Sequence, residues 1–194
     1  MRNVCARAFA TRVLFLAVFA TLFASTFGCA QQVSRWDIFG GYSYMRFDSV
    51  PIGFAGPSNL DGWNAAAAYN WSDTLSLAVD ASGHYGNQIT TYNYAVAPQY
   101  SYRWERSRVF GQALFGKAQN TVDIVQPTRT GFESVGLAYG AGAGFDWDYN
   151  SRFTIRAIQV DYLRDRTFRT SEGNIRVSAG LVVHFGRTHK KRRL

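Results

Sequence analysis

Near its C-terminal end the chain reads Asn174-Ile175-Arg176-Val177-Ser178-Ala179-Gly180-Leu181-Val182-Val183-His184-Phe185. Every second residue, from Ile175 to Phe185, is apolar, and the residues between them are mostly polar or small. A period of two residues places the two sets on opposite faces of a β-strand. The stretch therefore predicts a strand with one face suited to lipid and the other suited to a polar or crowded interior.

The same alternation recurs along the chain, whereas no segment after residue 30 carries a convincing helical stripe of apolar residues. It is clearest from Leu75 to Tyr85, from Tyr92 to Trp104 and from Val135 to Trp147. Eight stretches alternate in all, at residues 36–47, 60–71, 74–85, 92–104, 109–118, 135–147, 153–163 and 174–185. The sequence therefore predicts an all-β fold of eight strands.

The stretch 153–163 departs from strict alternation in an informative way. Arg156 and Asp161 would lie on opposite faces of a regular strand. Either a β-bulge near Ala157 brings both charges to the same face, or one of them faces outward. We favour the bulge, because it keeps both charges away from lipid.

The connections between the expected strands alternate in length. Those after the second, fourth and sixth strands are short, at residues 72–73, 105–108 and 148–151. Those after the odd-numbered strands are longer, at residues 48–59, 86–91, 119–134 and 164–173. Short turns on one side and longer loops on the other are typical of outer-membrane barrels, in which the turns face the periplasm.

The lengths of the strands fit a membrane. Strands of about 9 to 11 residues cross the hydrocarbon layer when tilted. In lipid the sheet must close, because unpaired backbone groups at an open edge would find no water. Eight closed strands leave an interior that side chains can fill, so a wide pore is not expected. The predicted fold is an eight-stranded antiparallel up-and-down transmembrane β-barrel over residues 31–186.

A soluble barrel of the lipocalin kind is the main structural alternative, and it would reverse the two faces. A water-facing surface would be rich in lysine and glutamate, yet Lys117 is the only lysine between Gln31 and Gly186. Aromatic residues also gather at strand ends, where membrane interface girdles lie; they include Trp36, Trp71, Trp104, Trp147 and Phe185. Both observations favour the membrane barrel.

The first 30 residues differ from the rest of the chain. A basic start is followed by an apolar run from Val13 to Phe23, and then by small residues up to Ala30. This order predicts a secretory signal peptide over residues 1–30, cleaved after Ala30. Lipidation of Cys29 is the alternative, and Thr26 argues against it, because lipoprotein signals usually carry an aliphatic residue at that position.

The charge of +8 is not spread over the predicted barrel. Basic residues concentrate in the signal peptide and in a C-terminal tail at 187–194, and residues 31–186 carry as many acidic as basic side chains. A nucleic-acid-binding fold would carry a basic face, so nucleic acid is not an expected partner. Both cysteines, Cys5 and Cys29, leave with the signal peptide, which excludes a mature cysteine-based metal site.

Several stretches resemble the OmpA-like outer-membrane β-barrel superfamily. They are 36–44, the glycine-rich 140–147, Asp161-Tyr162 and the terminal 176–185. The resemblance covers residues 36–186 and implies that Phe185 is the signal read by the barrel-assembly machinery. The chain stops before a peptidoglycan-binding domain, so no cell-wall binding carries over. The tail after Phe185 is not expected of such a signal; it is either a solvated periplasmic extension or a contact for lipid phosphates or acidic polymer.

Charged residues on the inward parity form the one group of candidate site residues. Unpaired charge inside a narrow barrel is costly. We therefore expect pairing across the lumen that plugs and rigidifies it, among Asp80, Arg103, Asp146, Arg156, Asp161 and Arg176. An ion path through the same residues is the competing interpretation.

A catalytic relay is conceivable at Asp80, Ser82 and His84, which share one face of a strand. Small polar residues that line a lumen need hydrogen bonds, and this role explains the row better. We expect no enzyme activity, cofactor or metal. The sequence predicts a monomeric outer-membrane protein, in contact with outer-membrane lipid, with a structural or surface-interaction role carried by its loops. A narrow channel and a lipid-modifying enzyme are the alternatives.

Overall fold

The computed structural model describes residues 34–49, 55–125, 129–166 and 172–187, and excludes the side chains of 123–125, 129–132, 172 and 187. Eight strands form one closed barrel in chain order. They are β1 (Ser34–Phe47), β2 (Ser58–Asn70), β3 (Leu75–Tyr85), β4 (Ile89–Trp104), β5 (Ser107–Val125), β6 (Arg129–Asp148), β7 (Phe153–Arg166) and β8 (Glu172–Arg187). Among the described residues, no helix is long and apolar enough to cross a membrane.

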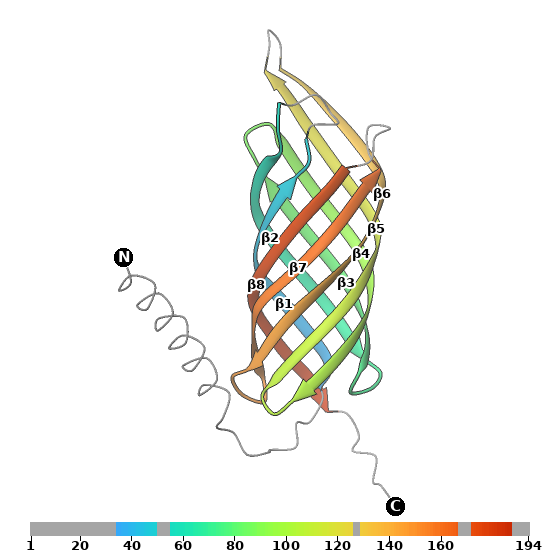
Figure 1. Cartoon of the computed structure of the whole chain (residues 1–194), viewed down its shortest axis with the longest axis vertical. Coiled ribbons are helices and arrows are strands. Elements are labelled where there is room, and N and C mark those ends of the chain that lie inside the picture. Colours follow the sequence, from blue (N-terminus) through green and yellow to red (C-terminus); the bar gives the residue numbers. More distant parts are fainter. Residues whose placement is uncertain (1–33, 50–54, 126–128, 167–171, 188–194) are drawn as a thin grey trace, which may run out of the picture. The chain divides into compact units, whose positions relative to one another are not determined.

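The barrel closes through pairing of its first and last strands. β1 and β8 are antiparallel, and their register runs from Ser34 opposite Arg187 to Arg46 opposite Ile175. Every other neighbouring pair is also antiparallel and consecutive in sequence, and the strands cross the barrel at a slant (Figure 1). The predicted up-and-down, eight-stranded topology is confirmed.

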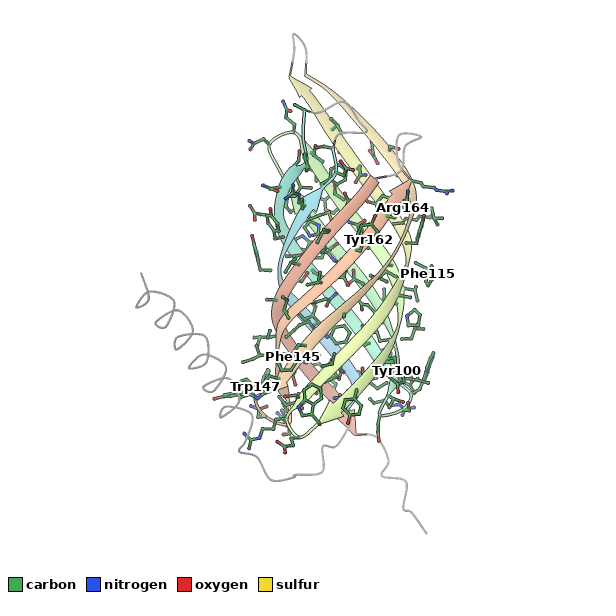
Figure 2. All side chains as sticks on the ribbon, in the orientation of Figure 1. Tyr100, Phe115, Phe145, Trp147, Tyr162 and Arg164 are labelled. Carbon is green, nitrogen blue, oxygen red and sulfur yellow. The ribbon has the colours of Figure 1, made fainter. Side chains whose placement is uncertain are left out.

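The two faces of each strand have opposite surroundings. In β8 the apolar Ile175, Leu181 and Phe185 are about half exposed, whereas Arg176 and Asn174 on the other parity are fully buried. The exposed side chains therefore form an apolar and aromatic outer wall, and the interior collects polar and charged groups (Figure 2). This is the membrane-barrel arrangement rather than the reversed, soluble one.

The bulge expected near Ala157 is present. From Arg156 to Gln159, β7 advances three residues while β8 advances only two, from Gly180 to Ser178. The extra residue resets the parity of the strand, so Arg156 and Asp161 are both buried inside the barrel.

Of the four expected long loops, one is wrong and two are shorter than expected. The segment predicted as a loop at 119–134 is mostly strand, because β5 continues to Val125 and β6 begins at Arg129. This pair extends well beyond the neighbouring strands (Figure 1). The loop expected at 86–91 is shorter than expected, because β4 begins at Ile89. The loop expected at 164–173 is also shorter, because β7 continues to Arg166 and β8 begins at Glu172. The polar residues of these segments predict a loop, although the structure pairs part of them in strands.

The predicted signal peptide (1–30), with its cleavage site and Cys29, lies outside the described residues, as does the basic tail after Arg187. Phe185 is described. It lies on the outer wall, opposite Trp36 of β1, and half of its surface is exposed.

Candidate functional site in the barrel interior

The middle of the barrel holds a cluster of two carboxylates around one guanidinium. Arg176 Nη1 donates to Asp80 Oδ1 at 2.7 Å, while its Nε and Nη2 donate to Asp161 Oδ2 at 3.0 and 2.8 Å. The cluster has a formal charge of −1, and all three residues are buried. Neutral donors offset the excess negative charge, because Asn64 donates to Asp80 and Gln112 donates to Asp161.

A second cluster lies near the end of the barrel that carries the short turns. Arg108 bridges two carboxylates, donating from Nη1 to Asp37 (2.9 Å) and from Nε to Asp146 (2.9 Å). Arg156 Nε donates to the other oxygen of Asp146 at 2.8 Å. Two acids and two guanidiniums balance in this turn-end cluster, and His184 also lies within hydrogen-bond distance of Asp37.

Gln159 links the two clusters. Its Oε1 accepts from Arg156 Nη1 at 2.7 Å, and its Nε2 donates to Asp161 Oδ2 at 2.8 Å. Arg156 is also held between the rings of Phe39 and Phe110, with its Cζ 4.4 Å from each ring centroid. The turn-side half of the interior is therefore one continuous network of fixed side chains rather than a row of mobile charges.

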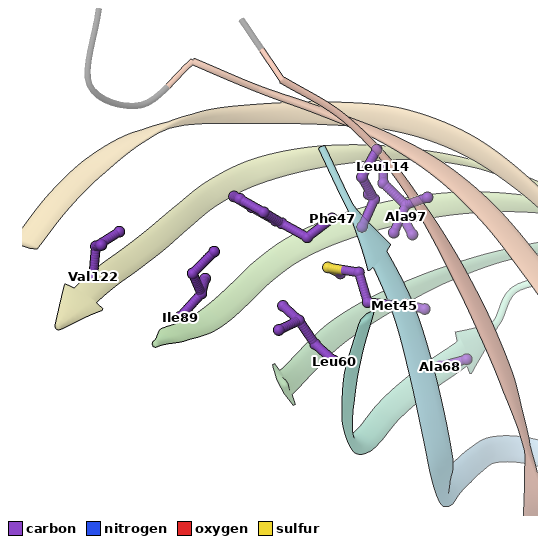
Figure 3. Close-up of a cluster of buried hydrophobic side chains, with 10 residues drawn as sticks. Met45, Phe47, Leu60, Ala68, Ile89, Ala97, Leu114 and Val122 are labelled. Carbon is purple, nitrogen blue, oxygen red and sulfur yellow. The ribbon is translucent and has the colours of Figure 1, made fainter. Parts of the chain in front are cut away.

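Apolar side chains fill the interior on the loop side of the charged network. Met45, Phe47 and Leu60 are at most 1% exposed, and they belong to a buried cluster with Ile89, Val122 and Leu163. Figure 3 shows Met45, Leu60 and Ile89 projecting into the barrel from different strands. This apolar layer, together with the ion pairs, occupies the interior in the described part of the chain.

The structure brings together five of the six lumen residues expected from sequence: Asp80, Asp146, Arg156, Asp161 and Arg176. Arg103 stands apart from both clusters, and its Nε donates to the carbonyl oxygen of Asp73 at 3.4 Å. It lies opposite Arg108 across β4 and β5. Arg108 already binds both nearby carboxylates, Asp37 and Asp146, so Arg103 does not pair with them.

Sequence reasoning missed three members of the turn-end cluster: Asp37, Arg108 and His184. Strand parity could have found all of them. Asp37 alternates with the outward Trp36 and Ile38, and His184 precedes the outward Phe185. The sequence pattern places Arg108 in a short turn, but it is the second residue of β5.

The conceivable relay at Asp80, Ser82 and His84 is not assembled. Arg176 Nη1 donates to Asp80 and to Ser82, whereas His84 Nε2 lies 2.8 Å from the hydroxyl of Ser43. All three relay residues are buried in the interior. Among the residues whose side chains are described, no group of histidine, cysteine or carboxylate side chains has the arrangement of a metal site.

A small pocket of about 390 Å³ opens at the loop side, lined by residues 58–61 of β2 and 85–89 of the β3–β4 hairpin. Asp61 in its wall accepts a hydrogen bond from Tyr42, and Tyr85 packs edge to face on Tyr92, 5.9 Å between centroids. The pocket is a concave polar surface on the loop side of the described barrel.

No protein-family model matches the chain, and a comparison with curated proteins finds no match either. Solved structures do match. Neisserial surface protein A has 14% identity and a TM-score of 0.62, with 78% of this chain and 98% of that chain covered. Ail, the attachment invasion locus protein of Yersinia pestis, has 16% identity and a TM-score of 0.53, covering 77% and 99%.

The outer membrane protein OprG from Pseudomonas aeruginosa matches with 13% identity and a TM-score of 0.57, over 80% of this chain and 98% of that chain. At these identities the likeness concerns the fold. It agrees with the resemblance to OmpA-like barrels read from the sequence. The chain has the fold of the small eight-stranded outer-membrane β-barrels.

Proposed function

We propose that this chain is an outer-membrane barrel with a plugged interior, whose role is structural or lies in interactions made by its loop-side surface. The proposal includes export by the signal peptide at 1–30 and insertion as a monomer. The observation that carries it is the filled interior. The turn-side half is closed by bridged ion pairs and the loop-side half by packed apolar side chains.

Because the interior is filled, we place the proposed function on the outer surface of the barrel. A rigid, closed barrel holds its loops in place, and loops can vary in sequence without disturbing the barrel. Such a scaffold favours a function carried by the loops. The β5–β6 hairpin, which extends beyond its neighbours, and the pocket between β2 and the β3–β4 hairpin are the surfaces available for contact. The structure of Ail in complex with a heparin analogue is in keeping with such a role for this fold.

A conductance measurement tests the plug. We expect the barrel, refolded and reconstituted in planar bilayers, to show no stable discrete openings, because an ion would have to displace bridged side chains and then cross the apolar layer. Arg156→Ala should stay equally silent, since that layer remains. A porin added to the same bilayer is the positive control. Discrete openings in the wild type that vanish in Arg156→Ala would establish a channel instead.

Phe185 is the proposed assembly signal, and its variants separate assembly from folding. We expect Phe185→Ala to lower the amount of heat-modifiable barrel in outer membranes about tenfold, with little change in refolding from urea into detergent, because the half-exposed ring is not part of the interior. Deleting 188–194 is the matched control and should leave both measurements unchanged. The opposite pattern would mean that the tail carries the signal.

A further inference from the structure

The loop-side pocket (residues 58–61 and 85–89) has walls that are held by backbone pairing. Its volume is about 390 Å³, and every residue that lines it belongs to the described part of the chain. Asp61 of β2 pairs with Tyr85 of β3, and the backbone N–H of Gly86 donates to the carbonyl oxygen of Ile89 at 2.8 Å. Small-molecule sites have volumes of roughly 300–1,000 Å³ and are largely pre-formed. The loop-side pocket has this size and these fixed walls.

The polar lining of the pocket offers both donors and acceptors. Asn59, Asn87 and Gln88 are exposed, and each of these amides can donate and accept hydrogen bonds. Asp61 adds a carboxylate, and the hydroxyl of Tyr42 donates to its Oδ1 atom, which fixes its orientation. Groups of this kind match a ligand that carries several hydroxyls, because a hydroxyl also donates and accepts.

The charge of the lining argues against an anionic ligand. Asp61 is the one charged residue among those that line the pocket. Arg46 of β1 is exposed and lies opposite Asn59, but β2 separates it from the pocket, which lies on the β3 side of that strand. An anionic group in the pocket would therefore meet a carboxylate without a cation to balance it, and such like-charge contacts are unfavourable.

An aromatic ring of fixed position borders the pocket at the level of the membrane surface. Tyr85 is about half exposed; its hydroxyl accepts from Trp63 Nε1 at 3.3 Å, and its ring packs edge to face on Tyr92. Trp63 and Tyr42 are also exposed on the outer wall, two residues closer to the turns than Asp61 and opposite each other. Interface girdles mark the level of lipid headgroups, so the pocket lies on the water side of this girdle.

We infer that the loop-side pocket binds a neutral saccharide; this inference rests on the proposed function, because it names a ligand for the loop-side surface. The amides of Asn59, Asn87 and Gln88 and the carboxylate of Asp61 bind the sugar hydroxyls, and the ring of Tyr85 packs against the apolar C–H face of a sugar. The saccharide is either the headgroup of a glycolipid in the same leaflet or a glycan that reaches the barrel from outside the membrane.

Ligand-observed NMR titration of the refolded protein, in a detergent without a sugar headgroup, tests the inference. The probes are the neutral disaccharides lactose, maltose and trehalose, with sucrose octasulfate as the anionic comparison. We expect at least one neutral disaccharide to bind at least tenfold more tightly than sucrose octasulfate. Asp61→Ala combined with Asn87→Ala should weaken that binding at least tenfold. Asp73→Ala combined with Gln119→Ala removes the same groups elsewhere on the surface and should leave it unchanged.

The sugar that binds is then compared free and attached to a lipid anchor in vesicles. A tenfold preference for the anchored sugar would support the pocket and identify a glycolipid as the source, whereas equal affinity would support the pocket and identify a glycan from outside the membrane.

The inference would be overturned if none of the three disaccharides bound, if sucrose octasulfate bound more tightly than all of them, or if the pocket variant bound as well as its control. Heat-dependent gel migration shows whether each variant is folded. A folded barrel with silent bilayers that binds no sugar would refute only the pocket. A soluble or conducting protein would refute the proposed function.

Discussion

Replacing Arg176 with methionine should destabilise the folded barrel by about 3–5 kcal/mol, because it leaves two buried carboxylates without the cation that binds both of them. Asp80 and Asp161 both bind this guanidinium, and each of the three residues is at most 3% exposed. Reversible urea unfolding in detergent or lipid vesicles, followed by tryptophan fluorescence, measures the change. The effect should appear as a lower unfolding midpoint with a similar slope.

Two companion variants separate charge from packing. Asp80→Asn leaves a one-to-one pair between Arg176 and Asp161 and should cost less than Arg176→Met. Adding Asp80→Asn and Asp161→Asn to Arg176→Met removes all three charges and should recover most of the lost stability. Equal midpoints for Arg176→Met and the wild type would show that the cluster is not formed in the folded barrel.

Gly41→Val should prevent efficient folding, whereas Gly40→Val should be tolerated. Gly41 faces inward, and a Cβ built on it would overlap the carbonyl oxygen of Ala179 and lie 2.9 Å from the Cα of Gly180. These are backbone atoms of β8, which cannot move aside without breaking the pairing that closes the barrel. We expect a loss of about 3 kcal/mol or more.

Gly40 is the matched control, since it lies on the same strand and a Cβ there meets nothing within 4 Å. Valine at this outward position should change stability by less than about 1 kcal/mol. The fraction of heat-modifiable protein after refolding and the urea midpoint report both variants. If both valines were tolerated, β1 and β8 would not approach as closely as the structure has them.

The fold was predictable because the residues that face lipid must be apolar, whereas the alternate residues, which face the interior, can be polar or charged. The parity of β8 alone, with Arg176 inside and Ile175 outside, gives its orientation. The bulge in β7 was predictable for the same reason, since Arg156 and Asp161 both need polar surroundings. Beyond the membrane the outer face of a strand meets water instead of lipid, so apolar and polar residues need not alternate there. The sequence therefore did not show that β5 continues to Val125.

The partners within the interior were harder to predict than the faces. Parity places Arg103 and Arg108 alike on the inner side of the barrel, but Arg108 lies directly opposite Asp146 across β5 and β6, whereas Arg103 lies one strand further away. Which residue stands opposite Asp146 depends on where β5 begins and on the register between β5 and β6, and the sequence assigned neither. The sequence therefore indicated a charged interior, while the division into two clusters bridged by Gln159 required the structure.

The bulge in β7 also bears on how this barrel can change during evolution. Loss of one residue from a regular strand would turn everything on one side of the deletion inside out, exposing charge to lipid. In this chain β7 already carries one surplus residue at Ala157 to Ile158, matched by neither neighbouring strand. A single-residue deletion there would make the register regular but turn both Arg156 and Thr154 from the interior toward the lipid. The shorter strand would therefore be stable in the membrane once both positions had also become apolar.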